Sequence, residues 1–251
     1  PDEPRFTVSR FRDGAIEAAN RIIAKGKRPL VVGGTGLYIN ALTYPLTFSQ
    51  IAPDGELRAE LMEKEQAKKG ALHEMLAETD AKAAKRLHPN DVKRIVRALE
   101  ICIKSGKKAS EQGEGFTYRN DDALEFTPVM AGINMPRDML YARIEKRVDD
   151  MFDAGLVDEV HALLSCGCTR ELPAMQGLGY KETIAYIMGE CTLDEAKETI
   201  KRETRRFAKR QLTWFRREER IRWFDATEYG CAEELGKAIA EHFLTQEEQN
   251  G

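Results

Sequence analysis

The densest group of charged side chains lies in residues 201–217, which end in TRRFAKRQLTWFRR. This segment holds eight Lys or Arg and one acid, Glu203, although the whole chain has a formal net charge of −3. Phe207, Gln211 and Trp214 stand among the cations. Cations bind phosphates, while rings and amides stack on or hydrogen-bond to unpaired bases. The segment therefore predicts a surface for single-stranded or looped RNA, and it lacks the broad apolar face of a membrane-surface helix.

Arg143 and Arg147 stand four residues apart in YARIEKRVDDMFDAG, residues 141–155. They flank an apolar stripe of a predicted helix. Both could form salt bridges with Glu145 or Asp150 of the same helix, a common arrangement. They could instead converge on a phosphate group, which the guanidinium fork binds well. The spacing leaves both interpretations open.

A second cationic face is predicted in HPNDVKRIVRALE, residues 88–100. Lys93, Arg94 and Arg97, followed by Lys104, fall on the side of this helix that faces away from its apolar stripe. Scattered charges usually indicate a solvated face. Because these charges share one sign, a polyanionic partner is a fair alternative.

Two glycine-rich segments could approach a ligand closely. VVGGTGLY, residues 31–38, combines a strand, a glycine turn and a helix start, where free N–H groups attract anions. A lone Gly-Gly-Thr-Gly is more often a tight connection, and no G-x-x-x-x-G-K-[ST] loop occurs in the chain. PAMQGLGYKE, residues 173–182, sets Gly177 and Gly179 before Tyr180, which could stack on a base. A plain helix–helix turn would hardly need both glycines.

Cysteine and histidine usage argues against a metal centre of those residues. The chain has five cysteines and four histidines without zinc-type spacing. An odd number of cysteines without a C-x-x-C pair predicts reduced thiols in a cytoplasmic protein. The sequence contains no run of 18 apolar residues, so it predicts no membrane-spanning helix.

The elements that position these residues predict an α/β protein. Glycine-bounded or β-rich apolar runs predict strands at 30–34, 127–134 and 221–226, the first of them buried and parallel. Helical periodicity and caps predict helices at 9–25, from 35 to 42, after Pro136, and at 156–165, 180–188, 194–217 and 231–244. Three strands are few beside so many helices, and the chain opens on a helix that feeds a strand. We therefore expect further strands upstream of Pro1.

Residues 45–125 differ from this pattern and predict a helical insertion. The segment is highly charged, has no strand candidate, and ends in a glycine- and Asp/Asn-rich loop. Asp54 can cap a helix through Lys68, and Asn90 can cap a second helix that Gly106 ends. The predicted domains are an α/β core of residues 1–44 and 126–251 and a helical domain of residues 45–125.

Five segments in this order resemble the bacterial tRNA dimethylallyltransferases, or isopentenyltransferases. They are PLVVGGTGLY, HPNDVKRIVRALEI, RIEKRVDDMFDAGLVDEV, QGLGYKE and TRRFAKRQLTWFRR, within residues 11 to about 225. The resemblance implies transfer of a dimethylallyl group from dimethylallyl diphosphate to N6 of the adenosine 3′ to the anticodon. It also implies a nucleotide-binding, P-loop NTPase-like core, Mg²⁺ as cofactor, a tRNA anticodon stem-loop as partner, and a monomer. The base would flip out of its stack to react.

The resemblance also implies roles for individual residues. Arg147 corresponds to the arginine that holds the diphosphate, and Thr35 stands at the catalytic centre. The positions implied to contact tRNA are Arg58, Lys93, Arg94, Arg97, Gln176, Gly177, Gly179, Tyr180, Lys181, Lys209, Arg210, Gln211, Thr213, Trp214 and Arg216. No metal ligand is implied within this chain.

The sequence departs from the family pattern in one respect. The family's P-loop and the Asp-Ser motif that carries the proposed base would lie upstream of Pro1 and are absent. We therefore expect the 251 residues alone to be inactive. The alternatives are a non-catalytic RNA-binding module and a P-loop nucleotide kinase relative. Comparing the affinity for an anticodon stem-loop with the affinity for a nucleotide would distinguish these alternatives.

Overall fold

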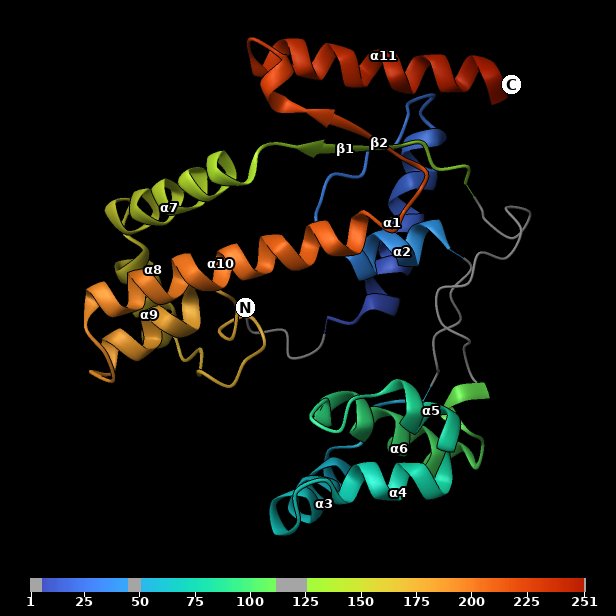
Figure 1. Ribbon diagram of the computed structural model, residues 1–251, viewed down its shortest axis with the longest axis vertical. Coiled ribbons are helices and arrows are strands. Elements are labelled where there is room, and N and C mark those ends of the chain that lie inside the picture. The colour runs from blue at the N-terminus through green and yellow to red at the C-terminus, as the bar shows by residue number, and fades with distance from the viewer. Residues whose placement is uncertain (1–5, 45–50, 112–125, 251) are drawn as a thin grey trace. The chain divides into compact units, whose positions relative to one another are not determined.

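The computed structural model describes residues 6–44, 51–111 and 126–250. Contacts divide the chain into two compact units, Pro1–Ile39 with Phe126–Gly251, and Asn40–Glu125. The second unit is inserted in the sequence of the first (Figure 1). The boundary drawn from the sequence lay at residue 44, and the contacts put it at residue 39.

The first unit contains a parallel pair of strands, β1 (Met130–Asn134) and β2 (Ile221–Asp225). Both strands were predicted, and the structure confirms them. Gly132 permits the close pairing, because an added Cβ would lie 2.8 Å from the ring of Trp223 and from Ile221. Figure 1 shows the two strands side by side, with α7 leaving the end of β1.

The third predicted strand, residues 30–34, is not found. The segment forms neither helix nor strand and is paired with neither strand of the described chain. Leu30 is 69% exposed and Val32 is 87% exposed, so the prediction of a buried parallel strand is wrong. An apolar run becomes a strand only where a neighbour accepts and donates its backbone hydrogen bonds, and the sequence alone does not show that neighbour.

Helices make up most of the first unit. They are α1 (Val8–Ile23), α2 (Gly36–Thr43, which crosses into the second unit), α7 (Arg137–Asp153), α8 (Leu156–Ser165), α9 (Tyr180–Ile187), α10 (Leu193–Phe215), η3 (Ala226–Glu228) and α11 (Ala232–Asn250). Thr192 and Glu195 form a capping box that starts α10. Gly155, with φ +97°, turns the chain from α7 into α8. Pro136 is the N-cap of α7, whose first helical residue is Arg137.

A buried cluster joins α8, α9 and the loop between them. Val160, Met175 and Ile184 are its least exposed members, and Met151 and Phe152 of α7 pack against it. The helix α10 contacts both α7 and α9. Apolar burial of this kind fixes the helices on which the candidate site stands.

The second unit is helical throughout its described part. Its elements are α3 (Gly55–Ala67), α4 (Ala71–Thr79), α5 (Ala81–Arg86), α6 (Val92–Ser105) and η1 (Ala109–Glu111). Asp54 caps α3 as predicted, accepting a hydrogen bond from Leu57 N at 3.1 Å. The N-cap of α6 is Asp91, not Asn90, because His88 and Asn90 form the turn before it. Leu72, Leu76 and Leu99 centre the core of this unit.

Candidate nucleic-acid interface

The glycine turn of residues 33–36 lies against the C-terminal half of α10. Gln211 Nε2 donates to Gly34 O at 2.9 Å. A Cβ added to Gly36 would lie 2.4 Å from the ring of Trp214, so only glycine fits there. Neither glycine has a positive φ. Their lack of a side chain therefore makes room for α10, and the structure brings together two segments that the sequence singled out separately.

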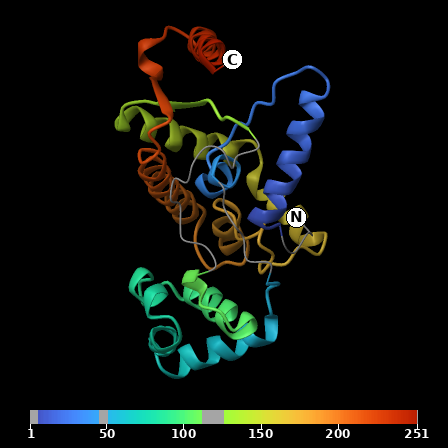
Figure 2. The same cartoon turned by 90° about the vertical axis from the view of Figure 1, so that its right-hand side faces the viewer.

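Thr35 stands at the surface between these two glycines. Its carbonyl accepts from Tyr38 N at 2.9 Å and from Ile39 N at 3.1 Å, which starts α2. The ring of Tyr38 stacks on Phe11 of α1 at 4.1 Å between centroids. Figure 2 shows α2 between α1 and the end of α10. The turn is thus held on both sides, and the side chain of Thr35 is left exposed.

The eight cations of residues 201–217 fall into two groups, and acids neutralise the first. Lys201 pairs with Asp149 of α7 at 2.9 Å, and the hydrogen bond between them raises the pKa of Lys201. Arg205 pairs with Glu145 of α7 at 2.6 Å. Glu203 forms ion pairs with both Arg202 and Arg206, at 3.3 and 2.7 Å. These four cations hold α10 to α7 or to itself.

The second group is the cationic end of α10, which we define as Lys209, Arg210, Arg216 and Arg217. All four are exposed, and none forms an ion pair with another described residue. The Arg210 guanidinium lies 5.9 Å from the ring centroid of Phe207, which is 45% exposed. Thr213 is exposed, but its hydroxyl donates to Lys209 O within the helix. An exposed ring among unpaired cations suits stacked bases and phosphates.

Arg143 and Arg147 are exposed on α7, beside the buried Ile144 and Val148. The salt bridges that the sequence left open are not formed. Asp150 instead bonds to Lys146, with both carboxylate oxygens 2.8 Å from Nζ, and Glu145 bonds to α10 as described above. Within the described ranges, both arginines lack an acidic partner.

The loop before α9 is braced from inside. Gly179 is the N-cap of α9 and donates its N–H to Glu182 at 2.9 Å, and its φ of +102° favours glycine there. Gln176 donates its side-chain amide to Arg170 O. The ring of Tyr180 is half-buried and its hydroxyl donates to Glu159, which raises the pKa of Tyr180.

Gly177 of this loop and Lys181 of α9 are the remaining predicted tRNA contacts of the segment. A Cβ added to Gly177 would lie 3.1 Å from Ala174 O. Lys181 is exposed, with Nζ 3.6 Å from Glu182. Of this segment's predicted tRNA contacts, Lys181 is thus the exposed cation, and the others take part in local packing or bonding.

In the second unit, Arg58 and Arg97 converge on a buried carboxylate that sequence reasoning missed. Arg58 donates twice to Glu100 at 2.8 Å, and Arg97 donates to it as well and to Ile51 O at 3.0 Å. Burial would raise the pKa of Glu100, but bonds from Arg58, from the backbone of Asp54 and from Arg97 outweigh it and lower that pKa to about 2. A glutamate four residues after Val96, on the apolar side of α6, was the signal that could have revealed it.

The remaining predicted contacts of α6 lie at its exposed start. Lys93 is exposed, with no ion pair to another described residue. Arg94 is 3.4 Å from Asp91, and its side chain is 72% exposed. Exposed pairs of this kind contribute little to stability, so both side chains are accessible to a ligand.

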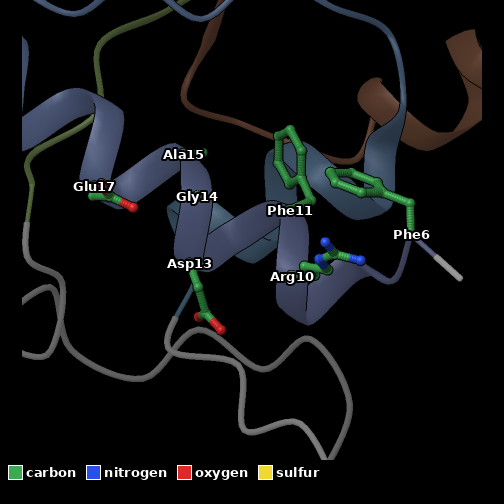
Figure 3. Close-up of a pocket in the computed structure, with 7 residues that line it drawn as sticks. All are labelled: Phe6, Arg10, Phe11, Asp13, Gly14, Ala15 and Glu17. Carbon is green, nitrogen blue, oxygen red and sulfur yellow. The ribbon is translucent and has the colours of Figure 1, made fainter. Parts of the chain in front are cut away.

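Other features of the described chain add no chemistry. Figure 3 shows an open hollow along α1, lined by Phe6, Arg10, Phe11, Asp13, Gly14, Ala15 and Glu17. Its lining belongs to one helix and its leading segment. Across residues 6–44, 51–111 and 126–250, three or more His, Cys, Asp or Glu nowhere gather as a metal site. In those same residues, no helix is long and apolar enough to cross a membrane.

The fold is that of an α/β protein, with a parallel strand pair among helices and a helical unit inserted in the sequence. The unpaired cations beside the glycine turn suit an anionic ligand. The family model for IPP transferase matches residues 1–218, and the chain belongs to that family.

Individual relatives agree with this assignment. A tRNA dimethylallyltransferase of Acetivibrio thermocellus is 46% identical over 247 residues, covering 98% of this chain and 77% of the relative. One of Desulforudis audaxviator is 50% identical over 231 residues, covering 92% and 73%. The solved tRNA isopentenylpyrophosphate transferase of Bacillus halodurans has a TM-score of 0.65 at 37% identity, covering 100% of this chain and 78% of that chain.

Proposed function

We propose that this protein transfers a dimethylallyl group from dimethylallyl diphosphate to N6 of the adenosine 3′ to the anticodon in tRNA. Relatives that share almost half of its sequence are tRNA dimethylallyltransferases. The single observation that carries the proposal is the glycine turn held by Gln211 and Trp214 beside the cationic end of α10. That arrangement puts an exposed Thr35 next to a surface suited to RNA.

The chemistry requires stabilisation of a leaving group. The bond between the dimethylallyl carbon and the diphosphate oxygen breaks, negative charge gathers on the diphosphate, and N6 bonds to the carbon and loses a proton. Arg147 is exposed on α7 and keeps its guanidinium free of acids in the described chain. Directed hydrogen bonds from such a group stabilise developing charge. We assign Arg147 this role.

Magnesium belongs to the proposal as the cofactor that the family resemblance implies. Among the described residues, no three His, Cys, Asp or Glu gather as a metal site, and no step above is assigned to the ion. The P-loop and the Asp-Ser motif with the base for the N6 proton are likewise parts of the proposal, and neither motif occurs in the 251 residues.

The experiment measures RNA binding and transfer separately. The 251-residue chain is titrated with an anticodon stem-loop carrying adenosine 3′ to the anticodon, and with the same RNA carrying guanosine there. Transfer is measured by mass spectrometry of nuclease digests, for this chain and for one extended at its N-terminus by a P-loop segment.

We expect stem-loop binding by the 251-residue chain, and prenylated adenosine only with the extended protein and the adenosine RNA. Binding without transfer by the extended protein would favour the RNA-binding module. Phosphorylation of a nucleotide in place of prenyl transfer would favour the kinase relative.

A further inference from the structure

We propose that Arg143 is a second diphosphate-binding residue, which acts together with Arg147 on one face of α7. This inference rests on the proposed function, because that function requires a diphosphate to be held. None of the residue roles implied by the family resemblance includes Arg143.

The geometry of α7 puts the two arginines together. Residues four apart on a helix are neighbours, with Cβ atoms about 5–6 Å apart. Ile144 and Val148 are buried between the two flanks of the helix. Glu145 and Asp149 lie on the flank that meets α10, where they bond to Arg205 and Lys201. Arg143 and Arg147 therefore lie on the other flank.

The charges around Arg143 and Arg147 destabilise α7 when no ligand is bound. Like charges four residues apart destabilise a helix. Asp150, three residues after Arg147, could relieve this, but it bonds to Lys146. Glu145 and Asp149 are occupied by α10. In the part of the chain that the structure describes, two adjacent guanidinium groups remain exposed without an acid, and an anion would supply the missing charge.

The chemistry of the pair matches a diphosphate. Each guanidinium presents a rigid fork of N–H donors that can hold a phosphate oxygen pair. A diphosphate has two phosphate groups, so two adjacent forks can bind one group each. Arg143 would then contribute mainly to affinity for the donor, while Arg147 meets the charge that develops on the leaving group.

Calorimetric titration with inorganic diphosphate tests this without RNA. The 251-residue chain is compared with Arg143→Ala, Arg143→Lys and Arg147→Ala at one ionic strength. Lys146→Ala is the matched control, since it removes one exposed cation of the same helix that is already paired. Charge-assisted hydrogen bonds predict about tenfold weaker binding or more for Arg143→Ala, partial recovery for Arg143→Lys, and little change for Lys146→Ala. Circular dichroism checks that every variant is folded.

Three results would overturn the proposal: no diphosphate binding by the unsubstituted chain, unchanged affinity in Arg143→Ala, or an equal loss in Lys146→Ala. The proposed function fails in a different way. If Arg143 is needed for diphosphate binding but the extended protein transfers nothing to tRNA, the anion site stands and the prenyl acceptor is wrong. In the extended protein, Arg143→Ala should raise KM for dimethylallyl diphosphate about tenfold with a smaller change in kcat.

Discussion

Two pairs of arginines in this chain differ in whether a carboxylate binds them. Arg58 and Arg97 of the second unit both bond to Glu100, whose side chain is fully buried. Arg143 and Arg147 of α7 remain exposed, and the acids nearest them in sequence bond to lysines or to α10. The family resemblance implies a ligand for Arg58, Arg97 and Arg147 alike. The comparison teaches that the position of the nearest carboxylate separates a structural arginine from one that is available.

The largest effect is expected at the carboxylate itself. Glu100→Gln leaves two guanidinium groups without their charge partner, which destabilises the second unit by about 3 kcal/mol, the low end for a broken buried pair because both arginines still reach water. Far-ultraviolet circular dichroism should show an earlier loss of helix in urea.

Tryptophan fluorescence gives the internal control for that substitution. Trp214 and Trp223, the two tryptophans of the chain, both lie in the first unit, so their transition should not move. A shift of both transitions together would mean that Glu100 does not act locally. An unchanged circular dichroism transition would remove the contrast between the two arginine pairs.

The second prediction compares one arginine from each pair. In the extended protein, Arg147→Ala should lower kcat about 10²-fold or more with little loss of stability, because a charge-stabilising donor is lost. Arg147→Lys should recover part of the rate, and tRNA affinity should stay nearly constant. Arg58→Ala should lower the urea midpoint of the second unit with a smaller effect on kcat. A reversed pattern would refute the distinction.

The third prediction uses acid to titrate the structural pair. The pKa of Glu100 is about 2 in the folded chain against 4.5 for the free group. Its contribution is therefore complete above the unfolded value and is lost as pH falls from there toward 2. Between pH 7 and pH 3 the loss from this group should be about 2 kcal/mol. The Glu100→Gln variant should lack this share of the acid sensitivity, and equal sensitivity in both proteins would contradict the assignment.

The smallest effect is expected in RNA binding by α10. Lys209→Ala with Arg210→Ala should flatten the dependence of log affinity on log salt by about 0.7 to 0.9 for each phosphate that the variant no longer binds. Arg202→Ala with Arg206→Ala is the control of equal charge, since both cations already pair with Glu203. A larger change of slope in the control would show that the ion pairs do not decide which cations bind RNA.

Much of the secondary structure could be predicted because its signals are local. The two strands with β-rich apolar runs and the helices with clear caps or closing glycines were predicted within a few residues. The run at residues 30–34 misled because pairing, not composition, makes a strand. Asn90 misled because two adjacent residues could both cap α6, and the preceding turn decides between them.

The site was harder to predict, because ion pairing depends on partners distant in sequence. The sequence marks residues 201–217 as basic, but Glu145 and Asp149 that neutralise part of it stand on another helix. The contact of Gln211 with Gly34 likewise joins segments far apart in the chain. The sequence marks the glycines at positions 34, 36 and 179 as unusual, but it does not show why each is glycine. Gly34 and Gly36 leave space for side chains of α10, whereas Gly179 adopts a positive φ.

The parallel pairing of β1 with β2 has a consequence for the order of folding. Met130 pairs with Ile221, and α7 to α10 lie between them in the chain. The entropy of closing so long a loop is lost before the strand contacts can offset it, which slows the folding of a structure of this kind. The helical unit of Asn40–Glu125 closes shorter loops, such as the one between Arg58 and Glu100, and emerges from the ribosome earlier. During synthesis this unit should therefore be compact while Gly34 and β1 still await α10 and β2.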